Sequence, residues 1–318
     1  MTPVTEDIWD LPTERRNPRT INIDELPPAE IVRLITAEDM LVPGLVAKAG
    51  PLITQAVEII TSRLRGGGRL HYFGAGTSGR IALMDAAELV PTYGIAPDLV
   101  VAHQAGGQTA MSAAREGVED DEAQGRRDAA ELTSADCAIG ITASGRTPYV
   151  SGALWSAKRA GAATMLVTSN PAAPIALHAD LAITVDTGPE VVAGSTRMKA
   201  GTAQKLVLNC ISTAVMIRLG RTYSNLMVTV EQSNGKLSER AVRILADATG
   251  RDPGQCRAAL ASAEDNLPVA LLMLLRDVSP EIAAELLEQT GGSARAALKL
   301  DLPTAPLSHA QTDDGKEQ

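Results

Sequence analysis

One stretch, Tyr72 to Gly94, constrains the fold of this chain more than any other part of the sequence. It reads as a short apolar strand, a turn rich in Gly, Thr and Ser, and a helix that Pro91 is expected to end. The turn, Gly74 to Gly79, has small side chains, so backbone N–H groups can surround an anion at the start of the helix. The stretch therefore predicts a phosphate-binding turn between a strand and a helix.

The same turn also matches the G-x-G-x-x-G pattern of dinucleotide sites. Such a site needs an acidic residue about 20 residues further on, at the end of the second strand, to bind the ribose hydroxyls. The expected second strand, Asp98 to His103, carries its acid at the start instead. Thr77 and Ser78 place hydroxyl groups inside the turn. We therefore favour a small phosphorylated ligand over a dinucleotide.

Apolar segments of strand length alternate with helical segments along the central part of the chain. The expected strands cover residues 69–73, 98–103, 136–142, 163–168 and 181–185. This alternation predicts an α/β fold with a mostly parallel five-stranded sheet flanked by helices. Apolar residues make up 45% of the chain and aromatic residues only 2%, which fits an aliphatic core on both faces of such a sheet. Ligands of these folds bind beyond the carboxyl ends of the strands.

The pattern of proline, glycine and apolar residues divides the chain into four parts. Residues 1–47 are expected to form a polar arm and a helix, and residues 48–233 a sheet domain that binds a small phosphorylated ligand. Residues 234–300 show helical periodicity broken by Gly and Pro, which predicts a small C-terminal helical domain. Residues 301–318 are expected to be a disordered tail. The N-terminal arm can still contact a ligand.

A second turn of similar chemistry, Thr142 to Thr147, follows the third expected strand and opens a helix at Pro148. Ser144 and Thr147 can bind a phosphate, and the alternative is that they only cap the helix. Two turns that both combine Gly with hydroxyl groups at strand ends favour phosphate binding.

A third segment, residues 194–205, leads into a long apolar helix and begins with Ser195 and Thr196. These hydroxyls can serve as helix caps. Arg197 and Lys199, however, stand at the positive end of the helix dipole, where cations are unfavourable. An anion bound between them would resolve this conflict, so the segment is a further candidate for phosphate binding.

Two acidic residues stand out for different reasons. Glu88 lies in the last turn of the helix that follows the first turn, where the negative end of the helix dipole favours the protonated acid. The alternative is that Glu88 is an ordinary surface residue. Glu119 lies in an acidic run of the kind that usually covers a solvated face, and the residue pattern alone does not select it.

Charge and motif spacing argue against several classes of protein. A net charge of −9 without a basic cluster argues against nucleic-acid binding, and residues 1–64 offer no basic helix-turn-helix. The four histidines are dispersed, so no metal site is expected. The longest apolar run, Val269 to Leu275, is too short for a bilayer, and neither a signal peptide nor paired cysteines are seen. We therefore expect a soluble cytoplasmic protein.

Several segments in order make the chain similar to one known family. They are FGAGTSGR, DAAELVPTYG, AGG, EGVEDD, ASGRTPYV and GSTRMKAGTAQKLVLN. Together they resemble the bacterial N-acetylmuramic acid 6-phosphate etherases, which belong to the sugar isomerase (SIS) fold group. The resemblance extends from the arm near residue 13 to the helical C-terminal part, and it implies the SIS, flavodoxin-like fold.

The resemblance also implies an activity. The family's enzymes are lyases that cleave the ether between D-lactate and carbon 3 of the sugar, by elimination and then addition of water. The products are N-acetylglucosamine 6-phosphate and D-lactate, and neither a metal nor a nicotinamide is needed. The family's two catalytic acids correspond to Glu88, taken as the proton donor, and Glu119, taken as the base, although these two roles can be exchanged.

Further expectations follow from the same resemblance. The positions expected to bind the phosphosugar are Gly76, Thr77, Ser78, Glu116, Ser144, Thr147, Ser195, Thr196 and Lys199. A homodimer with the active site near the subunit interface is also implied, as is a place in N-acetylmuramate catabolism and peptidoglycan recycling.

Two alternatives use the same fold. An aldose-ketose isomerase would also use a carboxylate base but would release no lactate. A non-catalytic sugar-phosphate sensor, such as the related glucokinase regulatory proteins, would be expected to lack one of the acids. Both Glu88 and Glu119 are present, which favours the etherase, although Leu89 stands where a Cys or Pro is usual.

Overall fold

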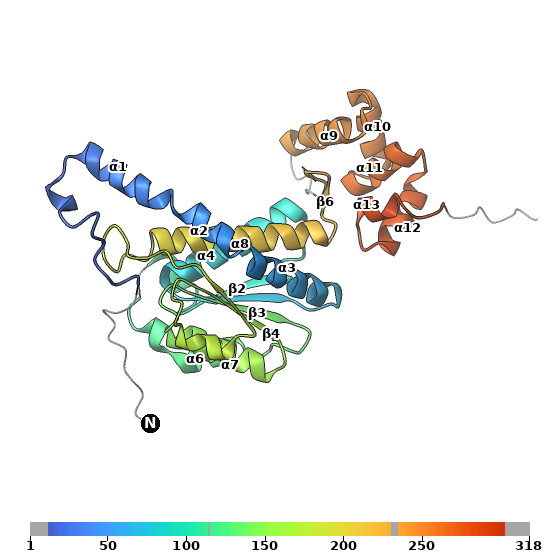
Figure 1. Ribbon diagram of the computed structural model, residues 1–318. Helices are drawn as coiled ribbons and strands as arrows, with labels where there is room; N and C mark the ends of the chain where they lie inside the picture. Colours follow the sequence, from blue (N-terminus) through green and yellow to red (C-terminus); the bar gives the residue numbers. More distant parts are fainter. Residues whose placement is uncertain (1–11, 114, 230–234, 303–318) are drawn as a thin grey trace, which may run out of the picture. The chain divides into compact units, whose positions relative to one another are not determined.

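The computed structural model describes residues 12–113, 115–229 and 235–302. The chain divides into two compact units, Met1–Arg221 and Thr222–Gln318 (Figure 1). This boundary lies 12 residues before the one predicted from the sequence, at residue 233. The short hairpin of β6 (Thr222–Tyr223) and β7 (Leu226–Met227) consequently lies in the second unit. Residues 303–318 of the expected tail lie outside the described residues.

The first unit is built on a parallel sheet with the strand order β2-β1-β3-β4-β5. The strands are β1 (Leu70–Gly74), β2 (Val100–Gln104), β3 (Cys137–Thr142), β4 (Ala163–Thr168) and β5 (Leu181–Thr184). The predicted five-stranded parallel sheet is confirmed, and its order is that of flavodoxin-like folds. The direction of winding changes between β1 and β3, so the carboxyl ends of these two strands flank the usual position of a ligand.

Alternate side chains of the strands build one core on each face of the sheet. In β1, Tyr72 packs in a core with α3 (Gly50–Arg65), α4 (Gly76–Tyr93) and α8 (Lys199–Arg218). The next residue, Phe73, packs in the opposite core with α7 (Pro148–Arg159), which lies beside α6 (Glu122–Asp128) (Figure 1). Helices therefore cover both faces and leave the carboxyl edge of the strands for the turns that follow them.

The remaining elements of the first unit are shorter or lie at its N-terminal end. They are η2 (Ile23–Glu25), α1 (Pro28–Asp39), α2 (Val42–Lys48), α5 (Thr109–Ser112), η3 (Val118–Asp120) and η4 (Pro174–His178).

The end of α4 differs from the prediction. Pro91 lies inside the helix, which continues to Tyr93 and ends where Gly94 adopts the left-handed conformation with φ 56°. Pro91 is in the last turn, so the helix loses only the hydrogen bond of one missing N–H there. Gly94 N–H closes the helix by donating to the carbonyl of Val90 at 2.9 Å. The expectation that Pro91 ends the helix is therefore wrong.

The second unit is helical, as predicted. It contains α9 (Gly235–Thr249), α10 (Pro253–Ser262), α11 (Leu267–Arg276), α12 (Pro280–Gln289) and α13 (Ala294–Ala297). These helices enclose their own core, in which Leu245 and Leu271 are fully buried. The last four helices each begin with a side chain that accepts a hydrogen bond from the backbone of the first turn; these caps are Asp252, Asn266, Ser279 and Ser293.

No single helix among the described residues combines the length and apolar character needed to cross a membrane. Two consecutive pairs, bent by 59° and 120°, meet that criterion only when each pair is taken together.

Candidate active site

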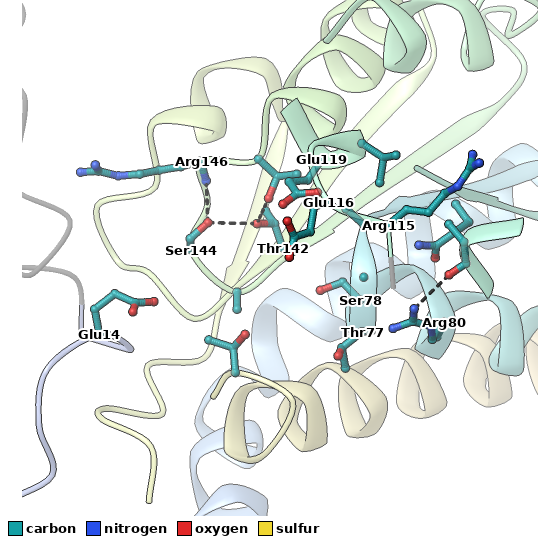
Figure 2. A pocket seen from close by; sticks show the side chains of 18 residues that line it. Glu14, Thr77, Ser78, Arg80, Arg115, Glu116, Glu119, Thr142, Ser144 and Arg146 are labelled. Carbon is teal, nitrogen blue, oxygen red and sulfur yellow. Dashed lines mark hydrogen bonds between the residues drawn. The ribbon is translucent and has the colours of Figure 1, made fainter. Parts of the chain in front are cut away.

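A cavity of about 550 Å³ lies at the carboxyl ends of β1 and β3 (Figure 2). Three of its walls are the turn before α4, the turn before α7 and the loop after β2. Two further segments complete it, the N-terminal arm and the segment before α8. The lining residues are Glu14, Ala75, Gly76, Thr77, Ser78, Arg80, Gln104, Ala110, Arg115, Glu116, Val118, Glu119, Thr142, Ala143, Ser144, Arg146, Thr147 and Thr196. A volume of this size is typical of small-molecule sites.

The first wall is the turn that leads from β1 into α4. A Cβ atom added to Gly74 would lie 2.6 Å from the backbone nitrogen of Gly79, so only glycine allows the strand and the helix to approach this closely. The helix begins at Gly76 without a side-chain cap. Thr77 and Ser78 line the cavity beside backbone N–H groups that have no intrahelical partner. This wall is therefore suited to an anion.

The second wall carries a cluster of three hydroxyl groups. Thr142 Oγ1 lies 2.7 Å from Thr147 Oγ1 and 3.4 Å from Ser144 Oγ. Gly145 has φ 68°, and a Cβ atom there would lie 2.3 Å from that of Ala173, so the tight turn requires glycine. Helix α7 starts after Thr147 without a side-chain cap. The alternative that Thr147 serves only as a helix cap is therefore not supported.

The third wall is the loop after β2, which carries Glu116 and Glu119. Arg80 of α4 holds the first part of this loop, since its Nε donates to the carbonyl of Met111 at 3.0 Å and its Nη2 to that of Ala110 at 2.9 Å. Glu119 lies in η3, and its side chain and that of Glu116 stand beside Thr142 in Figure 2. A carboxylate able to accept a proton thus shares the cavity with both hydroxyl turns.

The N-terminal arm and the segment before α8 complete the cavity with Glu14 and Thr196. A backbone hydrogen bond connects the two segments, in which the N–H of Gly194 donates to the carbonyl of Thr13 at 3.1 Å. Within the described residues, no group of three or more His, Cys, Asp or Glu side chains is placed to hold a metal ion.

Comparison with known proteins shows which family this chain belongs to. The SIS domain family matches residues 111–214, and the family described as "Glucokinase regulatory protein N-terminal SIS domain" matches residues 52–158. The N-acetylmuramic acid 6-phosphate etherase of Thermobifida fusca is 60% identical over 83% of this chain and 87% of its own length. The chain belongs to the N-acetylmuramic acid 6-phosphate etherase family.

A second sequence relative supports the same family, and a solved structure supports the fold. The N-acetylmuramic acid 6-phosphate etherase of Pectobacterium atrosepticum is 48% identical over 91% of this chain and 96% of its own length. The solved structure of a phosphoheptose isomerase from Francisella tularensis aligns with a TM-score of 0.50 at 18% identity, over 60% of this chain and all of that chain. The predicted SIS fold is confirmed.

The structure brings most of the expected etherase site residues together and leaves three outside. Those that line the cavity are Gly76, Thr77, Ser78, Glu116, Glu119, Ser144, Thr147 and Thr196. Glu88 is an exposed residue of α4 that does not line it. Ser195 lies in the loop before α8, where its N–H donates to the carbonyl of Val192 at 3.0 Å, and does not line the cavity.

Lys199 lies outside the cavity. Its side chain is 1% exposed, and its Nζ pairs with Glu38 Oε2 at 2.6 Å. Hydrogen bonds from Arg19, with Lys199 as a second donor, lower the pKa of Glu38 to about 2 despite its burial. Lys199 therefore neutralises a buried carboxylate and is not positioned to bind a phosphate in the cavity.

The start of α8 is closed by a second carboxylate. Glu190, which is fully buried, accepts hydrogen bonds from the backbone N–H groups of Lys199 and Ala200, both at 2.9 Å. Burial raises the pKa of Glu190, and these two N–H groups oppose that rise. The anion that the sequence suggested at this helix start is therefore supplied by the protein itself.

Several lining residues were not expected from the sequence. They are Glu14, Arg80, Gln104, Arg115, Thr142 and Arg146. Arg80, Thr142 and Arg146 lie within or next to the two hydroxyl turns, so proximity in sequence could have indicated them. Gln104 follows the second expected strand, whose carboxyl end lies at the edge where ligands bind, so its position also carries a signal. Glu14 carries none, because only the tertiary fold brings the arm to the cavity.

Proposed function

We propose that this protein cleaves the D-lactyl ether of N-acetylmuramic acid 6-phosphate and releases N-acetylglucosamine 6-phosphate and D-lactate. Family membership supports the reaction, and one observation on the site carries it: Glu119 lines the same cavity as the two hydroxyl turns. A phosphosugar held by its phosphate at these turns has its carbon skeleton in the remaining volume, next to a carboxylate.

The two turns are the proposed phosphate site. The N–H groups at the start of α4 and the hydroxyls of Thr77, Ser78, Ser144 and Thr147 offer hydrogen-bond donors without requiring a metal. Arg115 and Arg146 also line the cavity and favour anions by charge. An anionic sugar can thus bind locally to a protein whose net charge is −9.

The proposed chemistry is a proton abstraction followed by loss of the ether oxygen. Opening of the sugar ring leaves an aldehyde at carbon 1, which acidifies the proton on carbon 2. Glu119 removes this proton, a double bond forms between carbons 2 and 3, and the carbon 3–oxygen bond breaks. An acid protonates the departing lactate oxygen. Water then adds across the double bond, with its oxygen at carbon 3 and a proton at carbon 2.

Glu88 is the proposed acid, and its position suggests that it acts in a partner subunit. It lies ten residues beyond Ser78 in the same helix, which at the α-helical rise corresponds to about 15 Å along the axis. Its side chain cannot span that distance to a ligand in its own cavity. We therefore propose a homodimer in which Glu88 of each subunit completes the cavity of the other.

The reaction is tested by incubating the protein with N-acetylmuramic acid 6-phosphate in oxygen-18 water. Free D-lactate without label, together with one labelled oxygen in the sugar product, is expected. Binding of the sugar phosphate without lactate release would indicate a sensor instead, and a ketose product without lactate would indicate an isomerase.

The shared site is tested by mixing two inactive variants, Glu88→Gln and Glu119→Gln, under conditions that exchange subunits. If Glu88 acts on the partner's cavity, each mixed dimer has one site with both acids. Because half of the dimers are mixed, about one quarter of the wild-type activity should return. Absence of any recovery in dimers shown to have exchanged would place Glu88 outside the partner's site.

A place in the cell is part of the same proposal. Both the sugar 6-phosphate and lactate are charged and cross a bilayer poorly. This supports a cytoplasmic enzyme of amino-sugar catabolism that acts on N-acetylmuramate recovered from peptidoglycan. Activity on phosphorylated but not on unphosphorylated N-acetylmuramic acid is the expected outcome of a direct comparison.

A further inference from the structure

We propose that Glu14, on the N-terminal arm, binds the sugar hydroxyl groups of the substrate and so positions the sugar against the catalytic carboxylate. This inference rests on the phosphosugar ligand proposed above. Glu14 lines the cavity although it lies far in sequence from both hydroxyl turns. Figure 2 shows its carboxylate directed toward the cavity, on the side opposite Arg115.

Buried polar contacts hold the arm in place on both sides of Glu14. Thr13, Asn17 and Thr20 are 1%, 3% and 6% exposed. Thr20 Oγ1 donates to the carbonyl of Val191 at 2.8 Å, and Asn17 Nδ2 donates to that of Pro189 at 3.3 Å. With the backbone bond to Thr13, these contacts tie the arm to the segment that precedes α8. Residues 13–20 of the arm are therefore a well-anchored wall of the cavity.

An ion-paired network anchors the same arm to α8. Arg19 Nη2 donates to Glu38 Oε2 at 2.9 Å, and the same oxygen accepts from Lys199 Nζ at 2.6 Å. Lys199 is the first residue of α8, and Thr196, three residues earlier, lines the cavity. The buried charges thus fix the arm relative to the cavity wall.

The backbone beside Glu14 leaves room for its carboxylate. Gly194 has φ 75°, and a Cβ atom added there would lie 2.8 Å from Glu14 Oε2. Among the described residues Glu14 takes part in no ion pair, in contrast to Glu38, which pairs with Arg19 and Lys199. A carboxylate on a well-anchored backbone at the cavity wall, with no cationic partner among the described residues, can accept hydrogen bonds from a ligand.

The ligand group that suits Glu14 is a hydroxyl or amide N–H, since an ionised carboxylate only accepts hydrogen bonds. A phosphate oxygen next to it would be repelled. The phosphate is drawn to the two hydroxyl turns, so Glu14 contacts the sugar and not the phosphate. If Glu14 contacts only the sugar, its replacement should weaken the binding of a sugar phosphate but should not weaken the binding of inorganic phosphate.

The test compares Glu14→Gln with wild type and with Glu25→Gln, a matched control at an exposed position that does not line the cavity. Calorimetry measures the dissociation constants of N-acetylglucosamine 6-phosphate and of inorganic phosphate. For Glu14→Gln, the constant of the sugar phosphate should rise about tenfold, because the neutral amide oxygen is a weaker acceptor than the carboxylate and one of its two oxygens is replaced by a donor. The constant for inorganic phosphate should stay the same or fall, because a negative charge is removed. Glu25→Gln should match wild type for both ligands.

Two results would overturn the proposal. If neither constant changes, Glu14 does not contact the sugar. If both constants rise together, Glu14 only supports the structure of the cavity. Since binding is measured without turnover, a protein that binds the sugar phosphate but releases no lactate would remove the etherase proposal and leave this test intact.

Discussion

Three helices of the first unit begin in a different way from the capped helices of the second unit, although α6 of the first unit is itself capped by Asp121. In the second unit, α10 to α13 each use one of their own flanking side chains as a cap, and Asp252 with Gln255 even forms a reciprocal capping box. In the first unit, α4, α7 and α8 start without such a cap. Backbone donors at a helix start must find partners, so uncapped starts are available to other acceptors.

The three uncapped helices then differ among themselves. The starts of α4 and α7 face the cavity, whereas the start of α8 is filled by Glu190. All three carry Gly, Ser or Thr in the sequence before the helix. The same local signal therefore precedes two helix starts that face the cavity and one that the carboxylate of Glu190 closes.

The largest effect is expected from Glu119→Gln, which removes the proposed base beside the open helix starts. The amide cannot accept the proton, so kcat should fall by about 10³-fold or more. Affinity for N-acetylglucosamine 6-phosphate, measured by calorimetry, should remain near that of wild type. Full activity in this variant would remove Glu119 from the mechanism.

A large effect on stability is expected from acid, through Glu38 beside the closed start of α8. Its pKa is about 2 in the folded protein against a reference value of 4.5, so its ionised form stabilises the fold above pH 4.5. That stabilisation, roughly 3 kcal/mol, should be lost as the pH falls from 4.5 to about 2. Chemical denaturation at several pH values should show a shallower loss in Glu38→Gln than in wild type. Equal pH dependence in the two proteins would contradict this account.

The Lys199→Met variant tests whether Lys199, at the start of α8, stabilises the fold through its ion pair or binds the phosphate of the ligand. Removing one partner from a buried ion pair should lower the free energy of unfolding by about 3 kcal/mol. The dissociation constant of the sugar phosphate should not change, because Lys199 does not line the cavity. A weaker affinity with unchanged stability would return Lys199 to the phosphate site.

Ser144→Ala sharpens the comparison at the open start of α7. Loss of one hydrogen bond to a charged phosphate should weaken binding of the sugar phosphate by about tenfold, with little change in stability. Calorimetry and thermal denaturation separate these effects. An unchanged dissociation constant would mean that Ser144 serves only the local turn, where its Oγ accepts from the Arg146 N–H at 3.2 Å.

The smallest effect is expected from Asp252→Ala in the second unit. Loss of this cap should cost about 1 kcal/mol of stability. Since Asp252 caps α10 and does not line the cavity, kcat and KM should be unchanged. A loss of activity at preserved stability would show that this cap serves more than its helix.

The sequence by itself determined the class of fold and the local chemistry of the two turns. Alternation of apolar strands with helical segments requires parallel strands, and Gly74 and Gly145 mark turns that no larger residue allows. Hydroxyl groups within such turns lie at the carboxyl edge of the sheet because the turns directly follow the strands. This position does not depend on how the helices pack. These features depend on neighbours in sequence, so a linear pattern is enough to predict them.

Only the tertiary structure decided which charged side chains meet. Lys199 and Glu38 lie 161 positions apart in the sequence. Because their side chains form a buried ion pair, Lys199 is not available to bind a phosphate, the role that the sequence had suggested. Glu14 reaches the cavity from the N-terminal arm, and Glu88 is exposed and does not line the cavity, although its helix begins there. The energy of a charge depends on what surrounds it in space, and spacing along the chain does not contain that information.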